Sequence, residues 1–168
     1  MKGAGFMKAI VAVSSNLGIG YENDLLYNIP EDKKFFRSMT LGKVVVMGRK
    51  TLESMPGGKP LKDRTNIVLT RNTDYAPDGV TVCHGEDELL KHLESYESDD
   101  IMIIGGAEIY KLLLPYCDTA YVTKIKDEKP ADKFFPDLDS DEDWVLAESS
   151  EEKEYEDIGY SFCTYRRA

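Results

Sequence analysis

Short runs of hydrophobic residues alternate along the chain with segments in which hydrophobic residues recur every three or four positions. The runs cover residues 9–13, 44–47, 66–69, 80–83, 101–104 and 119–125, and the segments with helical spacing cover residues 30–39, 50–54, 87–96 and 107–114. Continuous Val and Ile runs separated by helices are typical of a parallel sheet that is covered on both faces. The pattern therefore predicts an α/β fold with a mostly parallel central sheet of about eight strands and helices on both of its faces.

The C-terminal part of the chain follows another pattern. Residues 137–157 are rich in acidic side chains, and residues 160–165 read as a strand. Strands that follow one another without a helix between them predict an antiparallel hairpin at the edge of the sheet. We interpret the acidic stretch itself as a solvated connection rather than as a functional segment.

Length and charge narrow the possible classes of protein. The chain has 168 residues, of which 42% are hydrophobic and 31% charged, and its formal net charge is −10. These values predict one globular domain over residues 7–168, with Met7 as a natural start and residues 1–6 as an N-terminal extension or a remnant of cloning. The negative charge argues against general binding to nucleic acid or to an anionic membrane, because both prefer a basic surface.

The cysteines and the longest hydrophobic runs bear on location. Cys83, Cys117 and Cys163 are an odd number, widely spaced and without a C-x-x-C pair, which fits neither a disulfide framework nor a zinc site. No hydrophobic run approaches the length of a membrane span, and the run over residues 9–13 is too short for the core of a signal peptide. We therefore expect a cytoplasmic protein without a metal site.

Asp32 is an unusual acid in its context. It follows Pro30, which fits the first turn of a helix, and it shares a helix face with Phe36 and Met39 at positions i+4 and i+7. A charge buried alone is expensive, so a carboxylate on an inward hydrophobic face usually has a partner or a task. The alternative is that Asp32 is only an early acid favoured by the helix dipole.

Glycines, hydroxyls and cations follow three of the predicted strands. These strand ends are Gly48-Arg49-Lys50-Thr51, Thr70-Arg71 and Gly105-Gly106-Ala107-Glu108. Ligands of open α/β sheets bind beyond the carboxyl ends of the strands, where glycine permits close approach and free N–H groups attract anions. The three ends together predict a phosphate-rich cofactor. Cations in place of an acid favour NADPH over NADH, although a complete G-x-G-x-x-G fingerprint is absent from the sequence.

Few residues are candidates for acid–base or nucleophilic chemistry. His92 falls on the polar side of a predicted helix and is expected to be solvated, and His84 follows a strand, where filling a loop is favoured over contact with a cofactor. The motifs G-x-S-x-G, H-E-x-x-H and G-x-x-x-x-G-K-[ST] do not occur. Hydrolysis by a serine or a metal centre is therefore unsupported. Hydride transfer needs only orientation, a proton source and a dry site, because the cofactor carries the reactive hydride.

Several stretches, taken in order, resemble dihydrofolate reductase. They are Gly-Ile-Gly-Tyr-Glu-Asn at 18–23, Asn-Ile-Pro-Glu-Asp at 28–32, Val-Met-Gly-Arg-Lys-Thr at 46–51, Ile-Ile-Gly-Gly-Ala-Glu-Ile-Tyr at 103–110 and Phe-Phe-Pro at 134–136. The similarity runs from Met7 to Arg167, almost the whole chain. It implies a dihydrofolate reductase-like fold and the reduction of dihydrofolate to tetrahydrofolate with NADPH, which supplies tetrahydrofolate for one-carbon metabolism.

The same resemblance implies the roles of the reacting groups. Hydride passes to C6 of the pterin, and N5 is protonated. Asp32 matches the single active-site acid of the family, and a carboxylate is able to accept two parallel hydrogen bonds from the pterin 2-amino group and the adjacent ring nitrogen. The acid favours the protonated N5, whereas a water molecule delivers the proton. Antifolates of the methotrexate and trimethoprim class are the expected inhibitors, and a monomer is the expected state.

The positions that match the substrate pocket are mainly hydrophobic. Arg64 matches the arginine that grips the glutamate α-carboxylate, a pairing suited to bidentate geometry. The alternative for Arg64 is a surface ion pair with Asp63. Thr123 matches a threonine that hydrogen-bonds the catalytic acid. The other matched positions are Ile10, Val11, Phe36, Met55, Leu61, Ile104 and Tyr110.

The positions that match cofactor contacts come mostly from the three strand ends. Arg49, Thr70 and Arg71 are best placed for the adenosine 2′-phosphate, and the bond between Gly105 and Gly106 is expected to be cis. The full matched set is Ala12, Ile19, Gly20, Gly48, Arg49, Lys50, Thr51, Thr70, Arg71, Ile104, Gly105, Gly106, Ala107, Glu108, Ile109 and Tyr110.

Residues 17–25 match the mobile loop that closes over the nicotinamide and are called the lid segment below. Gly18 and Gly20 are expected to give it flexibility, and closure excludes water from the reaction. Leu25 and Tyr27 join Asp32 as expected catalytic positions. Tyr27 stands where the family usually has Trp, whose indole N–H holds an active-site water, and a tyrosine hydroxyl is able to replace it at a different reach.

Two further departures from the family pattern concern backbone shape. Leu26 stands where proline is frequent, and Lys62-Asp63 replaces the commoner Pro-Gly before Arg64. The shape of the loop before Arg64 is therefore left open by the sequence.

Two other functions compete with this interpretation. Another NADPH reductase on the same sheet, such as the riboflavin-pathway reductase, would keep the cofactor positions but has no reason to keep Asp32 facing Phe36 with Arg64 opposite. A non-catalytic binder of folate or nucleotide would keep the pocket without needing Asp32 or the glycines of the lid segment. Analogy of fold alone does not separate these functions, so they have to be distinguished by the residues of the site.

Overall fold

The computed structural model of the protein describes residues 6–168. Phe6 leads into the first strand and is exposed, and the rest of the expected extension lies outside the described residues. The strands are β1 (Met7–Val13), β2 (Gly18–Gly20), β3 (Val44–Gly48), β4 (Thr65–Leu69), β5 (Val80–Cys83), β6 (Ile101–Gly105), β7 (Cys117–Lys126), β8 (Lys133–Phe134), β9 (Trp144–Ser149), β10 (Lys153–Tyr155) and β11 (Ile158–Arg167). The α-helices are α1 (Pro30–Thr40), α2 (Arg49–Glu53), α3 (Glu86–Leu93) and α4 (Ala107–Leu113), and short 3-10 turns cover Pro56–Gly58, Ser98–Asp100, Leu114–Tyr116 and Leu138–Ser140.

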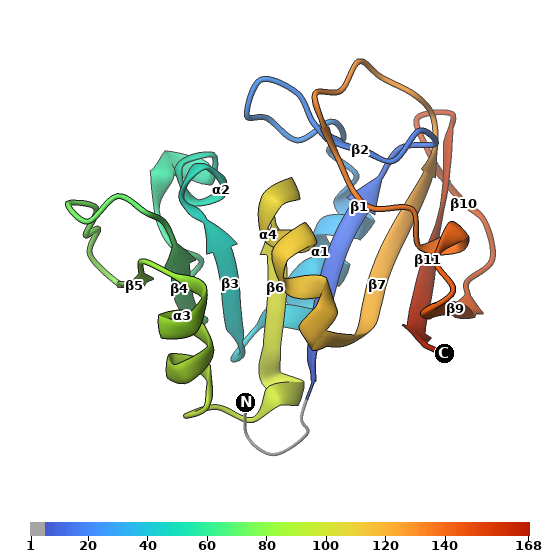
Figure 1. The fold of residues 1–168 in the computed structure, drawn as a ribbon. Coiled ribbons are helices and arrows are strands. Elements are labelled where there is room, and N and C mark those ends of the chain that lie inside the picture. Colours follow the sequence, from blue (N-terminus) through green and yellow to red (C-terminus); the bar gives the residue numbers. More distant parts are fainter. Residues whose placement is uncertain (1–5) are drawn as a thin grey trace.

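Nine strands of the described chain form one twisted sheet (Figure 1). Their order is β10-β11-β7-β1-β6-β3-β4-β5, and β9 pairs with β11 outside this path. The pairs from β7 through β5 are parallel, whereas β11 runs antiparallel to β7, β9 and β10. The expected mostly parallel sheet with an antiparallel edge is confirmed.

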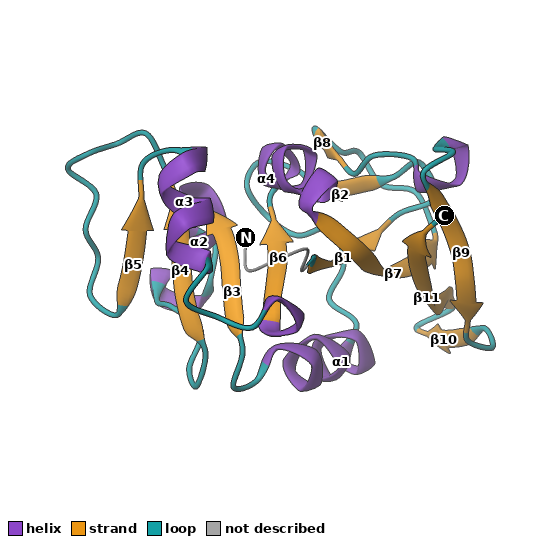
Figure 2. Cartoon of the chain, turned by 60° about the horizontal axis from the view of Figure 1, so that its bottom comes forward, coloured by secondary structure: helices purple, strands orange, loops and turns teal. Residues whose placement is uncertain are grey.

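Helices cover both faces of this sheet, and each face has its own hydrophobic core. Figure 2 shows α1 on one side of the strands and α3 and α4 on the other. Alternate residues of β3 separate accordingly, because successive strand side chains point to opposite faces. Val45 and Met47 pack with Leu52 of α2 and with the inward side of α1. Val44 and Val46 join the core beneath α3 and α4.

Hydrophobic periodicity located the expected helices and parallel strands to within a few residues. The largest error in these elements is at the end of α3, which stops at Leu93 rather than at residue 96. His92, expected to be solvated, is half-buried, and its ring stands 5.8 Å from that of Tyr96. Its Nε2 atom is buried without a hydrogen-bond partner among the described residues. The prediction was wrong because Tyr96, beyond the end of the helix, packs against this ring.

The interpretation of residues 137–157 as a solvated connection was also wrong, because β9 and β10 lie within it. Only Trp144 of β9 is buried, so an edge strand accommodates the acidic side chains on exposed positions. A two-residue turn links β10 to β11, and both of its residues, Glu156 and Asp157, have positive φ (49° and 66°). Such a turn usually carries Asn-Gly or Asp-Gly, so the sequence lacked the usual hairpin signal.

The cysteines of the described chain form no disulfide. The thiols of Cys83, Cys117 and Cys163 are free and buried. None of the helices within residues 6–168 has the length and hydrophobicity needed to cross a membrane.

Candidate active site

Asp32 lies in the first turn of α1 and faces into the protein. The helix begins at Pro30 without a side-chain cap, and residues further along its inner face pack in the core with Ile10 of β1 and Ile104 of β6. The Thr123 hydroxyl, buried on β7, donates a hydrogen bond of 2.6 Å to the Asp32 carboxylate. Burial raises the pKa of Asp32, and the hydrogen bond from Thr123 opposes this in part. This direction is expected of an inward acid rather than of a solvated acid at a helix N-terminus.

The hydrophobic positions of the expected substrate pocket gather near this acid, except Val11 and Tyr110, which belong to the opposite core. Ile10, Phe36, Met55, Leu61 and Ile104 belong to or pack against one core cluster. Val11 belongs to the opposite core, because it is the next residue along β1 and points to the other face. Only the backbone of Val11 is therefore available on the side of Asp32.

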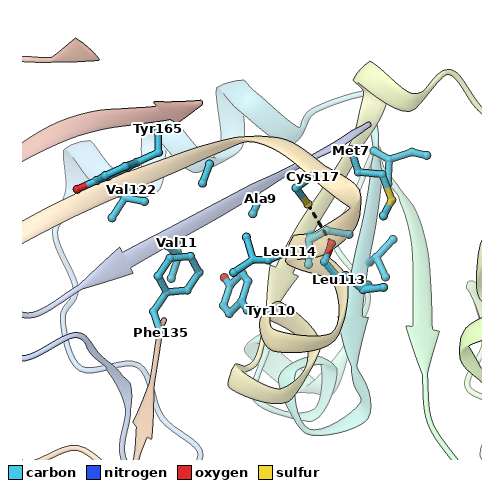
Figure 3. Packing of buried hydrophobic residues seen from close by; sticks show 14 of the residues in the cluster. Met7, Ala9, Val11, Tyr110, Leu113, Leu114, Cys117, Val122, Phe135 and Tyr165 are labelled. Carbon is cyan, nitrogen blue, oxygen red and sulfur yellow. Dashed lines mark hydrogen bonds between the residues drawn. The ribbon is translucent and has the colours of Figure 1, made fainter. Parts of the chain in front are cut away.

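Tyr110 joins β1, β6 and the start of α4. Its hydroxyl donates a 2.7 Å hydrogen bond to the carbonyl of Ile10, and its ring meets Phe135 edge-on with centroids 5.0 Å apart (Figure 3). A Cβ atom on Gly105 would lie 3.0 Å from the Tyr110 ring, so a larger residue would disturb this packing. Burial, and next the Asp32 charge, raise the pKa of Tyr110 far above its ordinary value, so the hydroxyl stays protonated.

The three strand ends with anion-binding character lie side by side. They belong to β6, β3 and β4, which are neighbours in the sheet. A Cβ on Gly106 would lie 3.5 Å from the Thr51 hydroxyl, and one on Gly48 would lie 3.2 Å from Ile109. The bond between Gly105 and Gly106 is cis, as expected. The glycines at these strand ends are far apart in the sequence, and the strand order therefore brings them together on one surface.

The chemistry of this surface fits a phosphate-rich dinucleotide. Within the described chain, Lys50 and Arg71 are exposed without an ion-pair partner, and Arg49 is paired with Glu53 at 3.1 Å. Such a local gathering of cations in a chain of net charge −10 is what an anionic ligand requires. His84 lies at the same edge, where its Nδ1 is 3.0 Å from the carbonyl of Thr70.

Arg64 lies near the C-terminal end of α1. Its Nε donates to the carbonyl of Lys62 at 2.9 Å, and its Nη1 donates to the Thr40 hydroxyl at 3.4 Å. Burial, and next the charge of Arg37, lower the pKa of Arg64. The alternative ion pair with Asp63 does not occur among the described residues. Two cations near one another with little compensation favour a carboxylate between them.

The lid segment carries a short strand. Gly18 and Gly20 of β2 pair with β8, and Glu22 and Asn23 form a turn with positive φ. Gly18 has a packing reason as well as the expected flexibility, because a Cβ there would lie 2.7 Å from that of Ala131.

Two expected catalytic positions lie at the end of the lid segment. The side chain of Leu25 is 78% exposed, so in this structure it covers nothing. Tyr27 donates its hydroxyl hydrogen to the Asp127 carboxylate at 2.9 Å. Its single proton is therefore not available to a water in the way expected of an indole N–H. Sequence reasoning missed Asp127, since nothing local marks an acid after a strand as the partner of a distant tyrosine.

A surface groove of about 290 Å³ lies elsewhere, between the end of α4 and β9. Trp144 and Arg167 line it, and none of the expected site residues does. The Arg167 guanidinium lies over the Trp144 ring and donates to the carbonyls of Cys117 and Leu114. These contacts tie β11 to the turn between α4 and β7.

The fold is a mostly parallel α/β sheet, and its neighbouring strand ends carry glycines and cations suited to a phosphate-rich ligand. The family model described as dihydrofolate reductase matches residues 6–167. Curated dihydrofolate reductases of Bacillus subtilis (37% identity, 94% of this chain and 92% of the relative) and Haemophilus influenzae (41% identity, 82% of each) are similar to it. A solved dihydrofolate reductase from Enterococcus faecalis, complexed with NADP(H) and RAB-propyl, has a TM-score of 0.86 at 36% identity, covering 98% of this chain and 97% of its own.

The chain belongs to the dihydrofolate reductase family. It is an NADPH-dependent oxidoreductase that reduces dihydrofolate to tetrahydrofolate and so serves one-carbon metabolism. The predictions of fold, reaction and cofactor are confirmed, and the competing riboflavin-pathway reductase and non-catalytic binder are not supported.

Proposed function

We propose that Asp32 is the acid on which this reduction depends. The observation that carries the proposal is a half-buried carboxylate of raised pKa, held by Thr123 at 2.6 Å beside a hydrophobic core. Its free oxygen lone pairs accept hydrogen bonds from the pterin 2-amino group and the adjacent ring nitrogen. The carboxylate then stabilises positive charge at N5, and a water molecule delivers the proton there. NADPH, when bound, supplies the hydride that reaches C6.

The substrate ring lies between Asp32 and hydrophobic side chains in this proposal. Those are the side chains of Ile10, Phe36, Met55, Leu61 and Ile104, with the backbone of Val11 and the Tyr110 ring behind them. Apolar walls exclude water and strengthen the electrostatic effect of the single acid.

NADPH is held along the joined strand ends. Gly48, Gly105 and Gly106 have no side chain, so they allow the cofactor to approach the protein backbone closely. Arg49, Thr70 and Arg71 bind the 2′-phosphate, and Arg49 exchanges its pairing with Glu53 for the ligand. The other proposed contacts are Ala12, Ile19, Gly20, Lys50, Thr51, Ile104, Ala107, Glu108, Ile109 and Tyr110.

The glutamate tail of the substrate binds at Arg64. The guanidinium offers a rigid set of donors that matches a carboxylate, and Arg37 adds positive charge nearby. The same contact recognises methotrexate, whereas trimethoprim uses Asp32 and the hydrophobic pocket alone. When the site is occupied, Leu25 of the lid segment covers the nicotinamide, and the Leu25 side chain would then no longer be exposed to solvent.

Further properties belong to the same proposal. Free buried thiols support a reducing, cytoplasmic location. The net charge of −10 disfavours nucleic acid and membrane surfaces as partners, and we propose a monomer over residues 7–168.

The test is the consumption of NADPH when dihydrofolate is added to the purified protein, with methotrexate as a control. In the wild type, we expect the absorbance of NADPH to fall and methotrexate to block this fall. In Asp32→Asn at neutral pH, the rate of this fall should be at least about a hundredfold lower, because the acid is essential to protonation of the substrate. NADPH binding should change far less. Near-normal turnover in Asp32→Asn would refute the assigned role.

A further inference from the structure

The loop after β7 holds the chain on both sides of the lid segment. Before the lid, the backbone N–H of Ser15 donates to the carbonyl of Asp127 at 3.0 Å. After the lid, the Tyr27 hydroxyl donates to the Asp127 carboxylate at 2.9 Å, and the Lys129 ammonium donates to the carbonyl of Leu26 at 3.1 Å. Figure 1 shows the lid segment and this loop beside one another above the sheet. Asp127 therefore contacts both flanks of the lid through two different groups.

Tyr27 is well fixed for a residue beside a loop. Its ring packs against the cluster that contains Ile29 and Ile125, and the Lys129 ammonium lies 4.6 Å from the ring centroid. Ala12, an expected neighbour of the cofactor, packs against the same cluster. Burial, and next the bond to Asp127, raise the pKa of Tyr27 far above its ordinary value. The hydroxyl therefore stays protonated at neutral pH and is able to donate its hydrogen bond.

The same piece of chain also holds the proposed catalytic acid. Thr123 on β7 bonds Asp32, and Asp127, directly beyond the end of β7, bonds Tyr27. Tyr27 and Asp32 flank the start of α1, which begins at Pro30 directly after Ile29. Two hydrogen bonds from one short stretch therefore set where the acid lies relative to the end of the lid.

We infer that Tyr27 and Asp127 are positioning residues for hydride transfer: their hydrogen bond fixes the end of the lid segment relative to Asp32. The inference rests on the site assignment proposed above. A bond from a phenol to a carboxylate is stronger than one between neutral groups and directional, so it suits this task. The pair acts through the lid and does not touch the reacting atoms.

The test is single-turnover hydride transfer, measured by stopped flow with NADPH and dihydrofolate on the full chain. Tyr27→Phe removes the hydroxyl and keeps the packed ring, Asp127→Ala removes the acceptor, and Asp127→Asn keeps an acceptor oxygen. Tyr116→Phe is the matched control, because the Tyr116 hydroxyl donates to Glu86 at the same 2.9 Å far from the lid. Melting temperatures of all variants separate a loss of positioning from a loss of stability.

We expect Tyr27→Phe and Asp127→Ala each to slow hydride transfer by about 5- to 30-fold, a part of what a hydrogen bond to a charged group is worth. The double variant should be no slower than either single variant, and Asp127→Asn should recover most of the rate. The inference would be overturned if Tyr27→Phe transferred hydride at the wild-type rate. It would also be overturned if the two single-variant effects on the rate multiplied in the double variant, or if Tyr116→Phe slowed the transfer equally. Asp32→Asn measured in parallel keeps the two proposals apart, because full activity there refutes the site assignment whatever the pair does.

Discussion

The Thr123 hydroxyl donates a 2.6 Å hydrogen bond to the Asp32 carboxylate across 91 residues of sequence. Thr123 is fully buried on a strand between β1 and β11, so its hydroxyl has a fixed direction. The bond orients one carboxylate oxygen and leaves the remaining lone pairs for a ligand. It also limits the rise in the Asp32 pKa that burial causes.

The raised pKa of Asp32 predicts that Asp32→Asn is more stable than the wild type at neutral pH. The folded state binds the Asp32 proton more tightly than the unfolded state, so folding is penalised as pH rises from the ordinary aspartate value of 3.8 through the raised one. Asn carries no charge and can still accept from Thr123. Each kcal/mol of gain raises the Tm by about 2–4 °C in a domain of this size.

Calorimetric scans at several pH values check this prediction. The difference between Asp32→Asn and wild type should be full at pH 7 and should disappear as pH falls below 3.8. A variant that is less stable than the wild type at pH 7 would contradict a desolvated Asp32.

Arg64→Leu is expected to weaken ligands that carry a glutamate tail and to spare those that do not. A charged bidentate contact is worth about 1.5–3 kcal/mol, so methotrexate and dihydrofolate should bind roughly 10- to 100-fold more weakly. Trimethoprim should bind as before. Equal losses for methotrexate and trimethoprim, measured by isothermal titration, would place the tail elsewhere.

Arg71→Ala is expected to narrow the preference for NADPH over NADH by about tenfold, because one phosphate contact is lost. The measurement is the ratio of kcat/KM values for the two cofactors. Arg166→Ala, on an exposed position of β11, is the control for a general loss of positive charge. An unchanged ratio in Arg71→Ala would move the 2′-phosphate away from this strand end.

Asp63→Gly is expected to stabilise the protein by roughly 0.5–1 kcal/mol. Asp63 has φ of 62°, a conformation that costs an L-residue energy and that glycine adopts freely. The loop before Arg64, whose shape the sequence left open, therefore contains a residue in a backbone conformation that glycine adopts without strain. Lys62→Gly, at the neighbouring residue without a positive φ, should instead destabilise the protein. Urea unfolding of both variants tests the pair, and a loss in Asp63→Gly would contradict the assignment of strain.

Local sequence patterns were sufficient to predict a large part of this fold. The alternation of Val and Ile runs with helical segments marked α1, β3 and β6 closely, because burial on a sheet face or a helix stripe imposes a short period on the sequence. Pro30 marked the start of α1, and the glycines marked the ends of β3 and β6. The residues of the dihydrofolate reductase resemblance are local in the same sense, which is why the family could be named from the chain alone.

Tertiary structure decided which of these pieces meet. The order β6-β3-β4 joined three separate anion-binding ends, and β7 brought Thr123 to Asp32 and Asp127 to Tyr27. Pairing with β11 also orders part of the acidic stretch as the strands β9 and β10. Val11 lies on the sheet face opposite to Asp32. A sequence period reports which side of an element is buried, whereas its partner across a long loop depends on packing of the whole sheet. The sequence by itself therefore determined the elements and the chemistry of their ends, and the fold determined the distances between them.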